Sequence, residues 1–207
     1  MEKYETVVVG DIVTHEEIIL NGYVCINNGI IEEVGSGEAP EACTILDYSG
    51  CWILPGVIDG QVHSRSQEGQ EDFLISTRAA AAGGVTTVVD MPYDDPLAVD
   101  NEAAFKRKVI DIEQQASVDC ALYATISPED GVRAIPELID AGACAFKFST
   151  YEAHPTRFPR ISDDVLFQAF KMISCYGLAC GVHNQDHILS AKNISKFKKQ
   201  NDVDASA

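Results

Sequence analysis

The pattern of apolar and polar residues divides the chain into two parts. In residues 1–52, short apolar runs such as TVVVG, EEIIL, GYVCINN and GIIEEVG alternate with the turn signals Asn-Gly, Asn-Asn-Gly and Gly-Ser-Gly. Short runs rich in β-branched residues between turn residues predict strands joined by tight turns. Because no run in this part has the periodicity of an amphipathic helix, we expect a small β-sheet module over residues 1–52.

From residue 53 onward, strands are predicted to alternate with helices. The sequence predicts strands over 52–59, 85–91, 118–126, 143–150 and 178–184, and helices over 71–82, 101–116, 128–142, 162–177 and 185–199. Gly83-Gly84 is expected to end the first of these helices and Asp100 to cap the second. Ser127-Pro128 is expected to open the third. The strands are apolar on both faces, which is typical of a parallel sheet covered by helices.

Two architectures fit five such β/α units, an open doubly wound sheet and a (β/α)8 barrel. An open sheet that binds a nucleotide should show a glycine fingerprint after its first strand, and DGQVHSRSQEGQE has none. Instead, His63, Lys147 and His183 fall at or near the carboxyl ends of three strands, the edge where barrel active sites form. We therefore predict an α/β protein in which residues 53–207 form the first five units of an incomplete (β/α)8 TIM-type barrel. The β-sheet module precedes it.

Composition narrows the classes of function. Lys and Arg total 15 against 32 Asp and Glu, and the formal net charge of −17 disfavours nucleic acid and anionic membranes as partners. The seven cysteines are scattered without a C-x-x-C motif, which argues against a disulfide framework or a zinc ribbon. The start of the chain lacks a signal-peptide pattern, and no segment reaches the roughly 18 apolar residues of a membrane span. A cytoplasmic protein is expected.

The first candidate site lies at the end of the first strand of the second part. Gln61 and His63 are two residues apart, so their side chains point to the same side of an extended strand. Two histidines at this spacing would offer two imidazoles to one metal ion, whereas Gln61 offers only an uncharged amide oxygen. The alternative is that His63 is an ordinary hydrogen-bonded polar residue.

Lys147 interrupts the otherwise apolar strand GACAFKFST. Burial of an unpaired ammonium is unfavourable, so a lysine in such a place usually has a chemical role. Its amine could act as a base, form a Schiff base or take up CO₂ as a carbamate. The alternative is that it faces solvent or pairs with Asp90. His183 ends the fifth strand and is a candidate metal ligand, whereas His187 is expected on the surface.

Arg65 is the candidate substrate-binding residue near the first strand. Its guanidinium could clamp a substrate carboxylate or carbonyl, or it could simply pair with Asp59 or Asp90. The polar loop at 67–72 is expected to be the solvated start of a helix.

Taken together, these residues resemble one family of enzymes. The stretches LPGVIDGQVHSR, EDFLISTRAAAAGGVTTVVDMP, AFKFST and GVHNQD are similar in order and spacing to the cyclic amidohydrolases allantoinase, dihydroorotase and hydantoinase. The resemblance implies a barrel with two divalent metals, usually zinc, bridged by a carbamylated lysine and by a hydroxide that opens the ring of a small cyclic amide. It implies that Lys147 is the carbamate lysine, that His63 is the second histidine of the first-strand pair, and that His183 is the fifth-strand ligand.

The sequence departs from the pattern of this family at three points. Gln61 stands where the family has its first histidine, which weakens one metal position. Arg65 matches the arginine with which dihydroorotases bind their substrate carboxylate, but Tyr93 stands in place of the asparagine, which favours an allantoinase-like or hydantoinase-like ring. The sixth-strand histidine and eighth-strand aspartate of the family fall beyond residue 207.

Two hypotheses about function follow from these departures. The first is a truncated cyclic amidohydrolase, inactive as a lone chain, whose full-length form is a homo-oligomer. The alternative is a non-catalytic amidohydrolase-like scaffold or interaction protein, for which Gln61 is the supporting feature.

Overall fold

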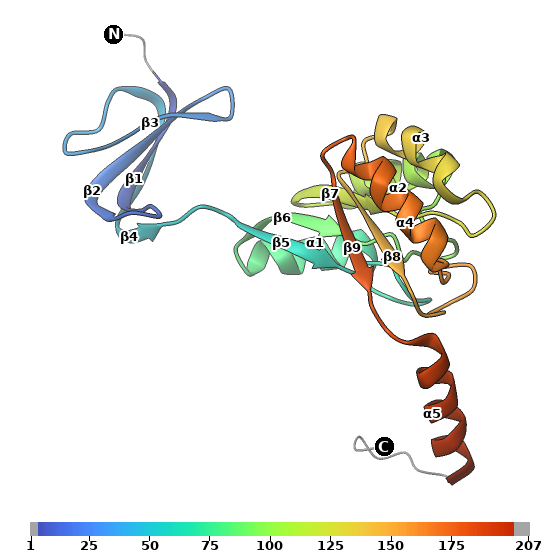
Figure 1. Ribbon diagram of the computed structural model, residues 1–207. Helices are drawn as coiled ribbons and strands as arrows, with labels where there is room; N and C mark the ends of the chain where they lie inside the picture. Colours follow the sequence, from blue (N-terminus) through green and yellow to red (C-terminus); the bar gives the residue numbers. More distant parts are fainter. Residues whose placement is uncertain (1–3, 201–207) are drawn as a thin grey trace. The chain divides into compact units, whose positions relative to one another are not determined.

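The chain divides into two compact units, residues 1–56 and the part that starts at Val57. The computed structural model describes residues 4–200 (Figure 1). The first unit consists of strands alone, and the second alternates strands with helices. Each unit therefore has the secondary structure expected from its pattern of apolar residues.

Four strands form the sheet of the first unit, in the order β3-β2-β1-β4. They are β1 (Tyr4–Val13), β2 (Ile18–Asn27), β3 (Ile30–Ser36) and β4 (Ala42–Ile53). β2 pairs antiparallel with β1 and β3, whereas β1 and β4 are parallel. Asn28 and Gly29, with φ of 50° and 73°, make the two-residue turn between β2 and β3. Val7, Cys25 and Ala42 form a small buried core.

The apolar residues of the runs EEIIL and GYVCINN, expected as two strands, belong to the single strand β2. Asn21 lies between them with a φ of 48°, and the register of β1 against β2 shifts beside it. The amide of Asn21 donates to Oδ1 of Asp11 at 3.0 Å. The Asn-Gly signal therefore marks an irregularity inside a strand, not a hairpin turn.

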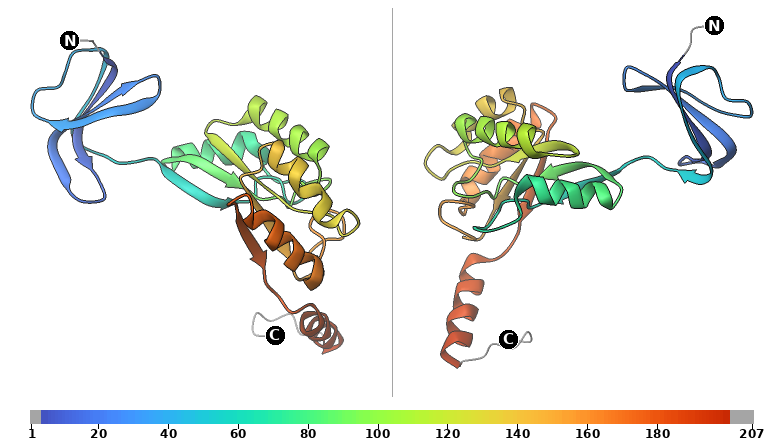
Figure 2. Two further views of the ribbon diagram at one scale, coloured as in Figure 1. Left: turned by 45° about the horizontal axis from the view of Figure 1, so that its top comes forward. Right: turned by 180° about the vertical axis from the view of Figure 1, so that it is seen from behind.

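Five parallel strands form the sheet of the second unit, in the order in which they follow along the chain. They are β5 (Val57–Val62), β6 (Val85–Asp90), β7 (Asp119–Ala124), β8 (Ala145–Ser149) and β9 (Ala179–His183). A doubly wound sheet would reverse its order part-way, which this sheet does not do. It curls as part of a barrel (Figure 2), which confirms the predicted fold class.

Helices follow the strands; the first four pack on one face of the curled sheet, whereas the last extends away from it (Figures 1 and 2). They are α1 (Asp72–Ala82), α2 (Glu102–Gln115), α3 (Ile135–Asp140), α4 (Asp163–Ser174) and α5 (His187–Gln200). The core between helices and sheet includes Phe73 of α1, Phe105 of α2, Phe146 and Phe148 of β8, and Ile173 of α4. The central strands are thus the best buried, whereas β5 is largely exposed.

The strand expected over 52–59 is interrupted at Pro55. β4 ends at Ile53 and β5 begins at Val57. Proline has no amide hydrogen to donate to a sheet, so it separates two strands more readily than it continues one.

Two helix starts also differ from expectation. Asn101, not Asp100, caps α2: its backbone is extended, and its Oδ1 accepts the amide of Ala104 at 2.9 Å. The helix expected over 128–142 is a 3-10 turn (Gly131–Ala134) followed by the short α3. Gly131 has a φ of 55°, outside the right-handed helical region, so a helix cannot continue through it from Pro128.

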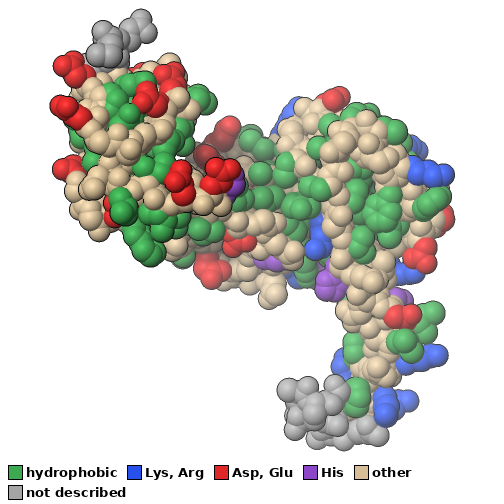
Figure 3. Space-filling view, turned by 60° about the vertical axis from the view of Figure 1, so that its left-hand side comes forward, with side chains coloured by type: hydrophobic (Ala, Val, Ile, Leu, Met, Phe, Trp, Pro, Cys, Tyr) green, Lys and Arg blue, Asp and Glu red, His purple; other side chains and the backbone are tan. Residues whose placement is uncertain are grey.

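Charged side chains are distributed unevenly over the chain. Acidic side chains are frequent on the first unit (Figure 3). α5, in contrast, carries Lys192, Lys196, Lys198 and Lys199 but no acidic residue. In the described part of the chain, none of the helices combines the length and the apolar character needed to cross a membrane.

Candidate active site

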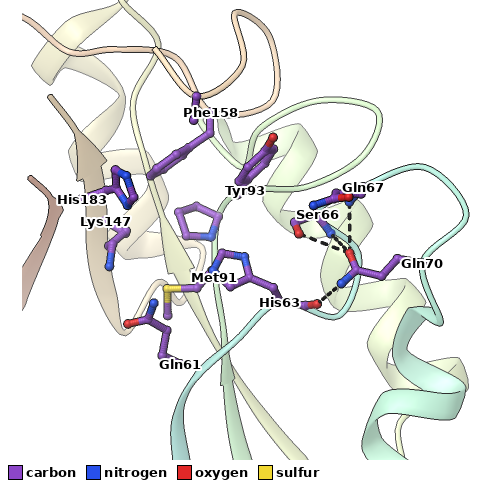
Figure 4. Close-up of a pocket in the computed structure, with 12 residues that line it drawn as sticks. Gln61, His63, Ser66, Gln67, Gln70, Met91, Tyr93, Lys147, Phe158 and His183 are labelled. Atoms are coloured by element: carbon purple, nitrogen blue, oxygen red, sulfur yellow. Dashed lines mark hydrogen bonds between the residues drawn. The ribbon is translucent and has the colours of Figure 1, made fainter. Parts of the chain in front are cut away.

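A pocket of about 390 Å³ opens at the carboxyl edge of the sheet in the second unit (Figure 4). Gln61 of β5 and His63, the residue after β5's end, line it together with Lys147 of β8 and His183 of β9. The carboxyl ends of parallel strands meet at one edge, which brings together residues up to 122 positions apart (from 61 to 183). All four side chains predicted to surround a metal site therefore line one pocket.

Lys147 is half-buried, and its side chain runs past β9. It pairs in register with Gly181, where an added Cβ would lie only 2.9 Å from Cδ of Lys147. The glycine thus leaves the space that the lysine side chain occupies. Within residues 4–200 the ammonium makes no hydrogen bond or ion pair, and Asp90, its expected alternative partner, is bound instead by Lys108.

The two histidines of the pocket lie in different environments. Burial lowers the pKa of His63; the charge of Asp90 opposes this effect, and Lys147 and His183 add to it. A lowered pKa keeps the imidazole of His63 neutral near pH 7, which is the form that binds metals. His183 ends β9, and its Nε2 lies 3.4 Å from Oε1 of Gln185.

Gln70 organises the loop that follows His63 (Figure 4). Its Nε2 donates to the carbonyl oxygen of His63 at 2.7 Å, and its Oε1 accepts the amides of Ser66 at 2.7 Å and Gln67 at 3.1 Å. Ser66, Gln67 and Gln70 all line the pocket. The 67–72 loop is a largely exposed start of α1, as expected, and two of its glutamines also line the pocket. A run of amide side chains directly after a strand end was the available signal.

An aromatic pair forms another wall of the pocket. The rings of Tyr93 and Phe158 stack with centroids 5.5 Å apart, and the ring of His63 meets Tyr93 edge-on at 6.3 Å. The guanidinium of Arg157 lies 5.4 Å from the centre of the Tyr93 ring and donates to the carbonyl oxygen of Ser66 at 2.7 Å. Phe158 comes from the loop after β8, and no sequence pattern pointed to it.

A buried charge cluster, formed by Arg65, Asp90, Asp94, Lys108 and Asp111, lies next to the pocket residues. Nζ of Lys108 is 2.6 Å from Asp90 Oδ1 and donates to the carbonyl oxygen of Met91 at 2.8 Å. The other oxygen of Asp90 accepts the amide of Ser64 at 3.0 Å. This bond fixes the segment directly after His63.

Arg65 belongs to this cluster and is not one of the residues that line the pocket. Its guanidinium binds Asp94 and Asp111, not Asp59 or Asp90 as the alternative reading had it. Burial by itself would lower the pKa of Arg65, but hydrogen bonds to these two carboxylates raise it above its ordinary value. A role as a substrate clamp would require the guanidinium to exchange these partners for a substrate group.

The donor atoms of the pocket decide which metal site it could form. Among residues 4–200, no three His, Cys, Asp or Glu side chains are arranged to hold a metal ion. The pocket offers instead two imidazoles, the amide of Gln61 and the amine of Lys147. An ammonium repels a cation, whereas a carbamate on the same amine would add a negative charge and oxygen donors. The residues therefore fit divalent cations when Lys147 is carbamylated.

Comparison with known proteins gives one consistent family. The dihydro-orotase-like family matches residues 50–193. An L-hydantoinase of Paenarthrobacter aurescens is 31% identical over 165 residues, and a dihydroorotase of Methanothermobacter thermautotrophicus is 32% identical over 184 residues. These matches cover 77% and 88% of this chain but 34% and 40% of the relatives. An allantoinase of Solibacter usitatus is 29% identical over 191 residues.

Solved structures agree with these sequence relatives. An L-hydantoinase from Arthrobacter aurescens superposes with a TM-score of 0.85 at 26% identity, over 95% of this chain and 44% of that structure. A D-hydantoinase superposes with a TM-score of 0.80 at 21% identity, a level that supports the fold alone. The chain thus spans less than half the length of the proteins it matches.

Proposed function

Because the chain belongs to the dihydro-orotase-like family of cyclic amidohydrolases, we propose that the protein carrying it hydrolyses a ring amide bond in a small cyclic amide or ureide. The observation that carries the proposal is the convergence of Gln61, His63, Lys147 and His183 on one pocket. A pocket of about 390 Å³ is large enough for a five- or six-membered ring.

The proposed cofactors are two divalent cations, with zinc as the expected metal. His63, His183 and a carbamate on Lys147 would hold them, and Gln61 would contribute a weaker amide oxygen. Carbamate formation joins the neutral lysine nitrogen to the carbon of CO₂ and releases one proton. Divalent cations bound here would supply a nucleophile at neutral pH by acidifying water, and would polarise the amide carbonyl.

The remaining residues of the pocket would bind and orient the ring. The stacked pair of Tyr93 and Phe158 offers a flat apolar surface against which a planar ring can pack, excluding water from one side. Gln70 would keep the loop after His63 in place through its three hydrogen bonds to the backbone. The five-stranded sheet is open, so we propose that residues 1–207 alone do not turn over substrate.

The test is hydrolysis by the full-length protein, loaded with Zn²⁺ in bicarbonate, of hydantoin, allantoin and dihydroorotate. We expect release of the ring-opened ureido acid from at least one of them. Lys147→Met should lose more than about 1,000-fold in kcat/KM, together with the bound metal measured by mass spectrometry. Lys171→Met, an exposed lysine of α4, is the matched control and should keep both. A fully folded, metal-loaded protein that opens none of these rings would contradict the proposal.

A second function is supported by Gln61, which removes one imidazole from the pocket. In a non-catalytic scaffold the protein would keep the fold and its surfaces but bind no metal. Metal analysis of the purified full-length protein separates the two proposals. About two metal ions per subunit favour the hydrolase, and none after dialysis against Zn²⁺ and bicarbonate favours the scaffold.

A further inference from the structure

Arg65 lies between two residues of the pocket in sequence, His63 and Ser66, yet three of the five N–H groups of its guanidinium donate to carboxylates outside the pocket. Nε and Nη2 donate to the two oxygens of Asp94 at 2.9 and 3.1 Å, and Nη1 donates to Asp111 at 2.8 Å. The aromatic ring of Phe73 lies 5.1 Å from the guanidinium carbon. Such a bidentate pair uses the edge of the guanidinium that would otherwise bind a substrate carboxylate.

The pairing is held in place by burial. The side chain of Asp94 is 0% exposed and that of Arg65 is 16% exposed. Besides Arg65, Asp94 accepts the amide of Asp95 at 2.9 Å and lies 3.8 Å from Nζ of Lys108. Withdrawing the guanidinium would leave a buried carboxylate with one distant cation, which is strongly unfavourable. A carboxylate that enters the pocket therefore competes with two carboxylates that are already in position.

Apart from the proposed metal ions, the described residues that line the pocket offer no other spare positive charge. Among the described lining residues Lys147 is the one lysine, assigned above to the metal site, and none is an arginine. Arg157 is not among the lining residues: its guanidinium lies 5.4 Å from the centre of the Tyr93 ring, donates to the carbonyl oxygen of Ser66 and lies 3.8 Å from Asp95. Gln61, Gln67 and Gln70 contribute neutral amides.

From these contacts we infer that Asp94 and Asp111 are specificity-determining residues of the site. By holding Arg65 outside the pocket, they restrict the substrate to cyclic amides and ureides whose ring substituents carry no negative charge. The inference rests on the proposed function and refines its substrate class. An anionic substituent beside the loop after His63 would be desolvated there without the guanidinium of Arg65 as its partner, which selects against it.

Two rings of equal shape test this inference in the full-length, metal-loaded protein. 5-(Carbamoylmethyl)hydantoin and 5-(carboxymethyl)hydantoin differ only in an amide against a carboxylate. We expect kcat/KM to favour the neutral ring by about 10-fold or more. Equal or faster hydrolysis of the charged ring would overturn the inference and leave the proposed hydrolase intact. If neither these rings nor hydantoin, allantoin and dihydroorotate are opened, the proposed function fails and the inference falls with it.

A variant then tests the role of the aspartates. Asp111→Asn keeps the shape of the side chain and a hydrogen-bond acceptor for Arg65 but removes one negative charge. The preference for the neutral ring, measured as the ratio of the two kcat/KM values, should fall by about 3-fold or more. Asp130→Asn, at an exposed ion pair with Arg133, is the control and should leave the preference unchanged. An unchanged preference in Asp111→Asn would refute the role of Asp111. The comparison of the two rings in the wild-type protein does not depend on the folding of any variant.

Discussion

The pocket and the buried charge cluster beside it each contain one lysine, and the two lysines differ in their partners. Lys108 in the cluster is 0% exposed and has Asp90, Asp94 and the carbonyl oxygen of Met91 around its ammonium. Lys147 in the pocket is half-buried, and the described residues give its ammonium no partner. Full burial therefore marks the structural lysine here, and a missing partner marks the candidate for chemistry.

The two regions are connected through the segment 63–66. Asp90 accepts the amide of Ser64, and Arg65 is bound by Asp94 and Asp111. The cluster therefore fixes this segment through hydrogen bonds to Ser64 and Arg65. His63 and Ser66 of the same segment face the pocket. Carboxylates thus surround the cations of the cluster, but no carboxylate is among the described residues that line the pocket. A metal site in the pocket would therefore need an added anion, such as a carbamate on Lys147.

The largest expected effect comes from breaking the cluster. Lys108→Met leaves Asp90 and Asp94 buried without their ammonium partner, and we expect the free energy of unfolding of the full-length protein to fall by about 3–5 kcal/mol. Urea unfolding followed by circular dichroism measures it. Lys106→Met, on the same helix in an exposed ion pair with Glu102, should cost about 0.5 kcal/mol or less. Equal losses in the two variants would show that the cluster is not the structural element described here.

A smaller effect is expected from displacing the lysine of the pocket without changing it. Gly181→Ala places a methyl group 2.9 Å from Cδ of Lys147, so the side chain must move. In the metal-loaded full-length protein we expect kcat/KM to fall by about 10- to 100-fold, as for a catalytic group shifted by about 1 Å. Gly60→Ala on β5 is the control, since nothing lies within 4 Å of its added Cβ. A Gly181→Ala enzyme as active as Gly60→Ala would show that the position of Lys147 is not critical.

Much of this arrangement could be predicted from the sequence, because it depends on local patterns. Apolar strands spaced regularly between helices gave the parallel sheet and the barrel class, and the quoted motifs gave the family. The pocket residues His63, Lys147 and His183 could be grouped because strand ends meet at one edge. Metal binding and carbamylation stay predictions.

What could not be predicted depends on contacts between distant segments. Arg65 and Asp111 are 46 residues apart, and no local pattern pairs them. Phe158 reaches the pocket from an irregular loop. Lys108 did carry a signal, since it shares the buried face of α2 with Phe105 and Ile112 at helical spacing. A buried lysine on an apolar helix face requires a carboxylate partner, because an unpaired buried charge is unfavourable. Asp90, at the end of a buried strand, was a candidate for that partner.

The smallest expected effect separates the two lysines most sharply. Lys147→Met replaces an ammonium that has no described partner by an apolar side chain of similar length beside Gly181. The removal of a half-buried charge relieves a desolvation penalty, so the free energy of unfolding should change by no more than about 0.5 kcal/mol or should rise. Unfolding must be measured with chelator and without bicarbonate, because the proposed metal ions would stabilise the wild-type protein alone. If Lys147→Met is destabilised as much as Lys108→Met, Lys147 is a structural lysine, and the contrast between pocket and cluster is lost.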